Sequence, residues 1–370
     1  MEHSFTQIII QILEEYFGEK AETVFHQSLL IQYLNEKTRS ANKGSKSRSS
    51  FANLFAVYVL VEDYLNNEFD ERGDYSAYQG AEFVHLFNRQ RELPFGEKLQ
   101  NHALNNRLNS EFQKFFPSSD IVPIVRNLDT NRYWFNESLI KLSFNGRNIN
   151  IAKQVIEIID AYIKVKNENL KKFVETCNQL QNIVDESPDF AVDFVLGLLD
   201  YNVDARLFEI VSYAILKYYY FDQEIFWGFE RNNLKTENLK LFKTGRTNAN
   251  DGGIDFVMKP LGRFFQVTET LDFKKYFLDI DKIQRYSITF VVKSEEQVDI
   301  LERKIKANAL INYGINQVVE KYMSCIEELI NLPILKERFA EAIQKGYLNR
   351  ILDEISLQSK VEFNYQELND

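Results

Sequence analysis

Cysteine is nearly absent from this chain, and its scarcity excludes two classes of protein. The 370 residues include two cysteines, Cys177 and Cys325, each isolated in a segment with helical periodicity. A disulfide framework needs paired cysteines, and a thiolate zinc site needs a cluster of them. We therefore expect both thiols to be small buried side chains. His85 and His102 are far apart and have no carboxylate at ligand spacing, which argues against a histidine zinc site.

Long apolar runs are missing as well. No stretch approaches the roughly 18 uninterrupted apolar residues of a membrane span. The N-terminus carries Glu2, Glu14 and Glu15 where a secretion signal has a basic region followed by an apolar one. We expect a protein that stays in the cytoplasm. Hydrophobic residues make up 45% of the chain, so it has the material for a large core, and its length favours two or three domains.

An excess of positive charge is also lacking, because the formal net charge is −10. A protein coated with nucleic acid needs clustered lysine and arginine, and the global charge taken alone argues against that function. An enzyme that encloses a short stretch of duplex is often acidic outside and basic in a cleft. The local distribution of charge therefore has to decide.

One carboxylate stands out in the second half of the chain. Residues 203–220 predict a helix that is apolar on nearly every side, and Glu209 lies within it. A carboxylate in such surroundings is costly unless it is paired or binds a metal. The simpler alternative stays open, in which Glu209 lies at the solvent edge or pairs with Arg206 one turn earlier.

Short strands are expected after this helix, at residues 239–243, 254–259, 263–268 and, beyond a polar helical segment, 287–293. Two glycines in the segment TGRTNANDGGIDF (244–256) allow a tight turn into the strand that carries Asp255 between two apolar neighbours. A turn at residues 260–262 then predicts an antiparallel hairpin. Its register brings Asp255 close to Gln266 and aims Thr268 at the same face.

These residues suit the hydrolysis of a phosphodiester, which needs carboxylates, a divalent metal and a group that orients water. A helix with Glu, a strand, the motif DGGID and a hairpin to an FQV strand together resemble the PD-(D/E)XK nuclease superfamily, particularly its branch with DGGID followed by Q-x-K. The resemblance covers residues 205–293. It implies that Asp255 and Glu209 bind Mg²⁺, that Gln266 stands where other branches have an acid, and that the chain is a bacterial type II restriction endonuclease.

The sequence departs from that family at Thr268, where the family has a lysine that orients or activates water. Two interpretations stay open: a lysine from a neighbouring element has taken over, or catalysis has been lost. For a substitute lysine, geometry favours Lys243, which ends the preceding strand. Lys259 lies at the hairpin tip, about 13 Å along the strand from Asp255 at roughly 3.3 Å per residue. The weaker participants are Arg246, Lys274 and Glu269.

Two segments upstream of this core contain the residue types that contact DNA. Arginine and lysine read guanine, asparagine and glutamine read adenine, and basic side chains take phosphates. Residues 36–50 form a basic loop, and residues 89–107 are rich in amide and basic groups. We expect DNA contacts from Lys43, Lys46, Arg48, Arg89, Gln90, Arg91, Lys98, Gln100, Asn101, Asn105 and Arg107. Solvated helix faces also contain such residues, and this alternative stays open.

The sequence thus predicts an α/β (α+β) fold in three parts. Residues 1–190 form a mostly helical DNA-recognition region, residues 191–300 a nuclease core with a mixed sheet flanked by helices, and residues 301–370 a helical C-terminal extension. The expected function is sequence-specific cleavage of double-stranded DNA with Mg²⁺. A cognate methyltransferase would act on the same site without binding the nuclease, and a palindromic target would favour a homodimer.

Rival interpretations also follow from the sequence. A modification-dependent nuclease keeps the chemistry but needs a pocket for a methylated base. A catalytically silent DNA-binding module is made credible by Thr268. The clustering of Glu209, Asp255 and Gln266 argues against a helical protein-interaction factor.

Overall fold

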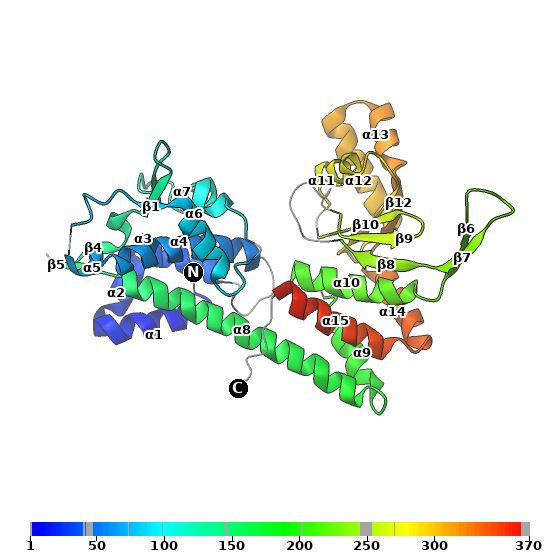
Figure 1. Cartoon of the computed structure of the whole chain (residues 1–370), viewed down its shortest axis with the longest axis horizontal. Coiled ribbons are helices and arrows are strands. Elements are labelled where there is room, and N and C mark those ends of the chain that lie inside the picture. Colours follow the sequence, from blue (N-terminus) through cyan, green and yellow to red (C-terminus); the bar gives the residue numbers. More distant parts are fainter. Residues whose placement is uncertain are drawn as a thin grey trace. The chain divides into compact units, whose positions relative to one another are not determined.

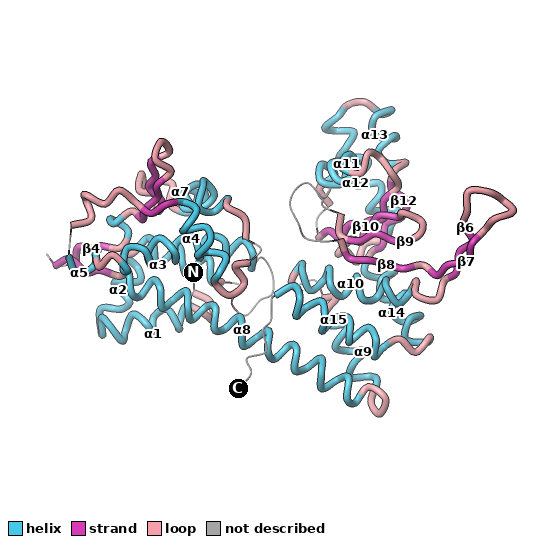
Figure 2. Tube along the Cα trace, viewed as in Figure 1, coloured by secondary structure: helices cyan, strands magenta, loops and turns pink. Residues whose placement is uncertain are grey.

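A computed structural model describes residues 2–39, 41, 47–72, 74–97, 99–144, 147–200, 203–244, 254–269 and 271–363. The chain forms two compact units, which divide within helix α8 (Ala152–Ile183): unit 1 ends at Lys172, and unit 2 runs from Phe173 to Tyr365. Both units combine helices and strands (Figure 2). Within the described ranges, no helix is long and apolar enough to cross a bilayer.

Unit 1 is mainly helical, with two small antiparallel sheets in the orders β1-β3-β2 and β4-β5. Its helical elements before α8 are α1 (Thr6–Phe17), η1 (Gly18–Lys20), α2 (Ala21–Gln27), α3 (Leu29–Thr38), α4 (Ser47–Asn66), α5 (Phe69–Arg72), α6 (Phe83–Glu92), η2 (Ala103–Arg107), α7 (Leu108–Phe115) and η3 (Glu137–Leu139). Its strands are β1 (Ala81–Glu82), β2 (Ile124–Asn127), β3 (Arg132–Phe135), β4 (Lys141–Phe144) and β5 (Arg147–Asn150).

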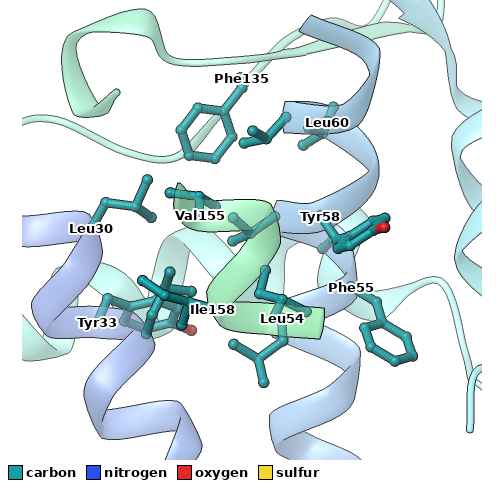
Figure 3. Packing of buried hydrophobic residues seen from close by; sticks show 14 of the residues in the cluster. Leu30, Tyr33, Leu54, Phe55, Tyr58, Leu60, Phe135, Val155 and Ile158 are labelled. Atoms are coloured by element: carbon teal, nitrogen blue, oxygen red, sulfur yellow. The ribbon is translucent and has the colours of Figure 1, made fainter. Parts of the chain in front are cut away.

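Helix α4 is the centre of the unit 1 core. Its stretch from Phe51 to Val61 is buried throughout, as expected for a helix that is apolar on every side. Figure 3 shows Leu54 and Leu60 of this helix in one cluster of buried side chains with Leu30 of α3, Phe135 of β3 and Val155 of α8.

Unit 2 is built around one five-stranded sheet. Its helices after α8 are α9 (Pro188–Gly197), α10 (Ala205–Tyr219), α11 (Phe273–Lys282), α12 (Val298–Tyr313), α13 (Asn316–Met323), α14 (Leu332–Gln344) and α15 (Leu348–Phe363). Its strands are β6 (Glu224–Trp227), β7 (Lys235–Asn238), β8 (Lys240–Lys243), β9 (Phe256–Lys259), β10 (Arg263–Thr268), β11 (Ile288–Val292) and β12 (Ile326–Ile330).

The sheet has the strand order β12-β11-β10-β9-β8. Strands β8, β9 and β10 are antiparallel, and the turn between β9 and β10 contains Gly262 with φ of 69°, a conformation that glycine adopts without steric cost. The antiparallel pairing of β9 with β10 confirms the predicted hairpin with its turn at residues 260–262. Strands β10, β11 and β12 are parallel, and helices make both crossovers, because parallel neighbours cannot be joined by a tight turn.

Helices cover both faces of this sheet (Figure 1). One face, with Phe265 and Val291, packs in a cluster with residues of α9, α10, α14 and α15. The other face, with Phe264 and Phe290, packs against α11, α12 and α13. Both cysteines are buried and free, as the sequence predicted. The result is a mixed sheet between two helical layers.

The last third of unit 2 corrects the sequence-based division of the chain. Residues 301–370 were expected to be a helical extension, but they contain β12, which pairs with β11, and the helices α14 and α15, which pack on α10. The segment completes the core. The first boundary also differs from the expected residue 190, because the contacts divide the chain after Lys172.

Replacing Phe290 by alanine tests this layered core. Its side chain is buried, and its ring lies 4.4 Å from that of Tyr276 on α11. We expect the free energy of unfolding to fall by about 3–5 kcal/mol, because the change leaves a cavity between sheet and helix. Urea unfolding followed by circular dichroism measures it. A loss below about 1 kcal/mol would contradict this packing.

Candidate active site

Asp255 joins three strands of the unit 2 sheet. The Cα pairing of β9 with β10 ends at Phe256 and Phe265, one residue after Asp255 along β9. The backbone oxygen of Asp255 accepts a hydrogen bond from the Thr244 N–H at 2.9 Å, beside β8. On the β10 side, its backbone N–H donates to the Phe265 oxygen at 3.1 Å, and its Oδ2 accepts from the Val267 N–H at 2.7 Å. The carboxylate is thereby held between β8 and β10.

The surroundings raise the pKa of Asp255 to about 7. Burial is the largest cause, because it disfavours the charged form, and the negative charge of Glu209 adds to it. The Val267 N–H and the positive charges of Arg206 and Lys275 act in the opposite direction. Two carboxylates in one poorly hydrated place repel each other, and a cation bound between them would favour the ionised form of both.

Glu209 lies on α10 with its side chain buried, and it contacts two cations. Lys243, the last residue of β8, has its Nζ 3.1 Å from Oε1 of Glu209. Arg206 of the same helix contacts Oε2. The pairing with Arg206 that the sequence left open is therefore present, and Lys243 does approach the expected metal site. In this state Lys243 and Arg206 balance the charge of Glu209.

Gln266 and Thr268 lie on the opposite face of β10 from Phe265 and Val267. These two apolar residues belong to the cluster that α10 covers, so the alternating side chains of Gln266 and Thr268 point towards α11. Both polar residues are buried. In the described part of the chain, Oε1 of Gln266 has no hydrogen-bond partner. A buried oxygen left without a partner costs about 1–3 kcal/mol, and such an atom suits a water molecule or a cation.

Lys275 is a candidate site residue that the sequence did not single out. It lies in the first turn of α11, and its Nζ is 3.5 Å from Oγ1 of Thr268. Its charge also lowers the pKa of Asp255. The ammonium thus lies in the space that a lysine side chain at position 268 would reach. The available signal was that α11 follows β10 directly, so its first turn begins near the end of that strand; the sequence reasoning named the neighbouring Lys274 instead.

A second ion pair lies beyond the end of β10. Nζ of Lys293, which follows β11, lies 3.0 Å from Oε1 of Glu269, and the Lys293 side chain is 2% exposed. The same ammonium lies 5.4 Å from the ring centroid of Phe208 on α10. Glu269, expected as a weaker participant, is therefore paired with a buried cation.

The oxygen donors fit a magnesium ion in type, although they are few. Among the residues that the structure describes, no group of three or more His, Cys, Asp or Glu is arranged to hold a metal ion. Mg²⁺ is commonly held by one or two carboxylates, with water and substrate phosphates completing its shell. Asp255 and Glu209 supply two carboxylates, and the unpartnered oxygen of Gln266 is a third oxygen donor on the strand next to Asp255.

No family model, curated protein or solved structure matches this chain. The interpretation of the site therefore depends on the geometry of unit 2 and on the short motifs that the sequence contains.

Internal bonds occupy several of the residues expected to contact DNA in unit 1. Arg89 forms two hydrogen bonds of 2.8 Å with the carboxylate of Glu62. Gln90 is completely buried, and its Nε2 donates to the backbone oxygen of Ala52 at 3.0 Å. The expectation for Gln90 is corrected by this burial, because its amide has no surface to offer a base edge. The charge of Arg89 is balanced within the unit.

Other expected contacts are more accessible. Arg91 is exposed, and its Nε donates to the backbone oxygen of Glu97 at 2.6 Å. Gln100 and Arg107 are exposed, while Asn101 and Asn105 are half-buried. The remaining candidates, Lys43, Lys46, Lys98, Arg246 and the side chain of Arg48, lie outside the described residues.

Proposed function

We propose that the chain is a Mg²⁺-dependent type II restriction endonuclease of the PD-(D/E)XK kind, which cleaves double-stranded DNA at a specific sequence. The observation that carries the proposal is the placement of Asp255, a buried carboxylate fixed between β8 and β10 by hydrogen bonds with Thr244, Phe265 and Val267. Burial and the charge of Glu209 raise its pKa to about 7, which supports the proposal. Perturbed carboxylates of this kind cluster at functional sites. The order of elements in unit 2 adds support: a helix with Glu209, three antiparallel strands with Asp255 and Gln266, a helix, and a parallel strand.

In this proposal Asp255 and Glu209 hold the metal, and the amide oxygen of Gln266, which faces α11, binds a water molecule on the other side of β10. Mg²⁺, when bound, stabilises negative charge on the phosphate and makes a bound water more acidic. The hydrogen bond from the Val267 N–H fixes the carboxylate of Asp255, and Lys243 keeps the charge of Glu209 balanced when no metal is present.

The ammonium of Lys275 has the role that the resemblance gives to a lysine at position 268. It lies beside Thr268, which is two residues after Gln266 on β10. Lys275 is therefore on the same side of the sheet as the side chains of Gln266 and Thr268. There it orients the attacking water and offsets charge on the phosphate. Lys243 is already engaged with Glu209, which makes Lys275 the better candidate.

Exposed polar residues of unit 1, such as Arg91, Gln100 and Arg107, would read the DNA in this proposal. Phosphate contacts position a protein, whereas contacts with base edges specify the sequence. A cognate methyltransferase would protect the same sequence in the host without binding the nuclease.

A second candidate is a DNA-binding module without catalysis. Two observations favour it: Glu209 is already paired with Arg206 and Lys243, and Thr268 replaces the lysine. Such a module would bind DNA by the same surfaces and leave it intact.

Incubation of the purified protein with unmethylated phage DNA separates these candidates. With Mg²⁺ we expect discrete fragments, and with EDTA we expect none, because the carboxylates alone do not activate water. Parallel digests of methylated DNA test dependence on modification. Binding without fragments at any Mg²⁺ concentration would select the silent module, and fragments only from methylated DNA would select a modification-dependent nuclease.

A further inference from the structure

The hairpin β6–β7 extends from unit 2 beyond the edge strand β8 (Figure 1). Its base is anchored, since the N–H of buried Leu239 donates to the Gln223 oxygen at 2.8 Å. Within the described chain, β6 and β7 pair only with each other. A two-stranded ribbon is marginally stable alone, and both of its outer edges carry unused backbone donors and acceptors.

This ribbon also exposes large apolar side chains. Phe226 is 70% exposed, Leu234 is 52% exposed, and Phe229 in the connecting loop is fully exposed. Large side chains of this kind gathered on one projecting element are typical of a contact surface.

The hydrogen bond at the base determines which groups of β7 point outward. Leu239 and Gln223 form a hydrogen-bonded pair, and such pairs alternate along an antiparallel ladder. Residues 237 and 235 therefore bond inward to β6, as pairs with residues 225 and 227. The N–H and C=O of Thr236 point to the free edge.

The charges of this edge are self-complementary. The strand reads Lys235, Thr236, Glu237. If β7 meets a second copy of itself antiparallel, with the two-fold axis at Thr236, the two threonines exchange their outward N–H and C=O groups. Each Lys235 then stands opposite the Glu237 of the other copy, in a pair without backbone bonds, where side chains approach most closely.

We infer that β7 forms an antiparallel β-ladder with β7 of a second copy of this chain, so that two hairpins make a four-stranded sheet. The register is specific, because a shift of two residues in either direction places Lys235 opposite Lys235 or Glu237 opposite Glu237. Phe226, cross-strand from Thr236, adds an apolar side chain to the same face from each copy. This inference does not depend on the proposed nuclease activity.

The charge of the hairpin favours a second copy over DNA. Residues 221–240 contain four carboxylates (Asp222, Glu224, Glu230 and Glu237) and three cations (Arg231, Lys235 and Lys240). A net negative ribbon is repelled by phosphates. The interface is small, so we expect a dimer with a dissociation constant on the order of micromolar, without DNA present.

Exchanging the charges at positions 235 and 237 tests the inference. Sedimentation velocity of the full chain measures the fraction of dimer. Neither residue has a charged cross-strand partner inside the hairpin, so the ribbon itself loses little. Lys235→Glu and Glu237→Lys each place two like-charged pairs across the axis, and we expect each to weaken the dimer at least about tenfold. The double variant restores opposite charges and the dimer. An equimolar mixture of the two single variants also restores it, because both pairs are then opposite in charge.

Thr236→Pro provides a second line of evidence. Proline removes the outward N–H but no bond to β6, and edge strands tolerate it. We expect a monomer with an unchanged melting temperature. A monomeric parent at about 100 µM would overturn the inference, as would single variants that dimerise like the parent or a double variant that stays monomeric. If the parent is monomeric and the variants change DNA affinity instead, the hairpin contacts DNA and the inference is wrong.

Discussion

The Asp255→Asn variant is expected to lose Mg²⁺-dependent cleavage by roughly 1000-fold or more, while the metal-free protein becomes more stable at pH 8. The loss of activity follows because asparagine keeps the shape but removes the charge that holds the metal. The gain in stability follows because the ionised carboxylate is buried near Glu209, and the amide avoids that repulsion. Fragment formation from plasmid or phage DNA measures the first effect, and thermal unfolding in EDTA measures the second.

The pH dependence of this variant has a definite sign. The folded pKa of about 7 lies above the ordinary value of 3.8, so protonation of Asp255 favours the folded state. That contribution is complete below about pH 4 and is lost as the pH rises through 7. We therefore expect the melting temperature of Asp255→Asn to exceed that of the parent by about 2–5 °C at pH 8 and to match it near pH 4.

Asp299→Asn is a matched control, because Asp299 is an exposed carboxylate on α12, 62% accessible and paired with Arg303. Exposed pairs of this kind contribute about 1 kcal/mol or less. It should leave cleavage and the difference between pH 4 and pH 8 unchanged. If Asp255→Asn cleaves DNA as fast as the parent, the metal site is wrong.

Lys275→Ala is expected to slow cleavage about 100- to 1000-fold, and a second change, Thr268→Lys, is expected to recover at least about tenfold of that loss. A cation that orients water or offsets phosphate charge contributes in this range. The recovery follows because a lysine at position 268 reaches the place that the Lys275 ammonium occupies, 3.5 Å from Oγ1 of Thr268. Single-turnover rates with saturating Mg²⁺ measure both.

DNA affinity with Ca²⁺ in place of Mg²⁺ distinguishes catalysis from binding, and it should change much less than the rate. Lys306→Ala on α12, a half-exposed lysine paired with Glu320, is the matched control and should cleave like the parent. If Thr268→Lys recovers nothing, or if Lys306→Ala loses as much as Lys275→Ala, the role of Lys275 is wrong.

The local part of the site was predictable from the sequence. The hairpin from β9 to β10 depends on a short turn, and its register, which ends with Phe256 opposite Phe265, then brings Asp255 beside β10. Likewise the apolar run of α10 predicted its helix, whereas the sequence left open whether Glu209 was buried or lay at the solvent edge, and the structure buries it. Each of these features is determined by neighbours within a few residues along the chain.

Pairings between distant segments were missed. β12 reads IEELI, with charged residues inside a helical surrounding, and its partner β11 is more than thirty residues earlier. A parallel partner this far away leaves no local signal in the sequence, because the segment between the two strands shows the apolar periodicity of its crossover helices. The hairpin β6–β7 was missed for a different reason: both strands are only four residues long, and β7, which reads KTEN, is exposed throughout and has no apolar residue.

The sequence by itself determined the helix of Glu209, the hairpin of Asp255 and Gln266, and the absence of a lysine at position 268. The pairing of Glu209 with Arg206 is local to α10 and was already open in the sequence. Only the tertiary structure decided which cations from other elements meet these groups, namely Lys243 at Glu209 and Lys275 at Thr268. The physical reason is that the turn of a hairpin and the side-chain period of a helix depend on residues close together in the chain. A contact between side chains of two different elements forms only when those elements pack together. That packing depends on the apolar surfaces of the whole unit.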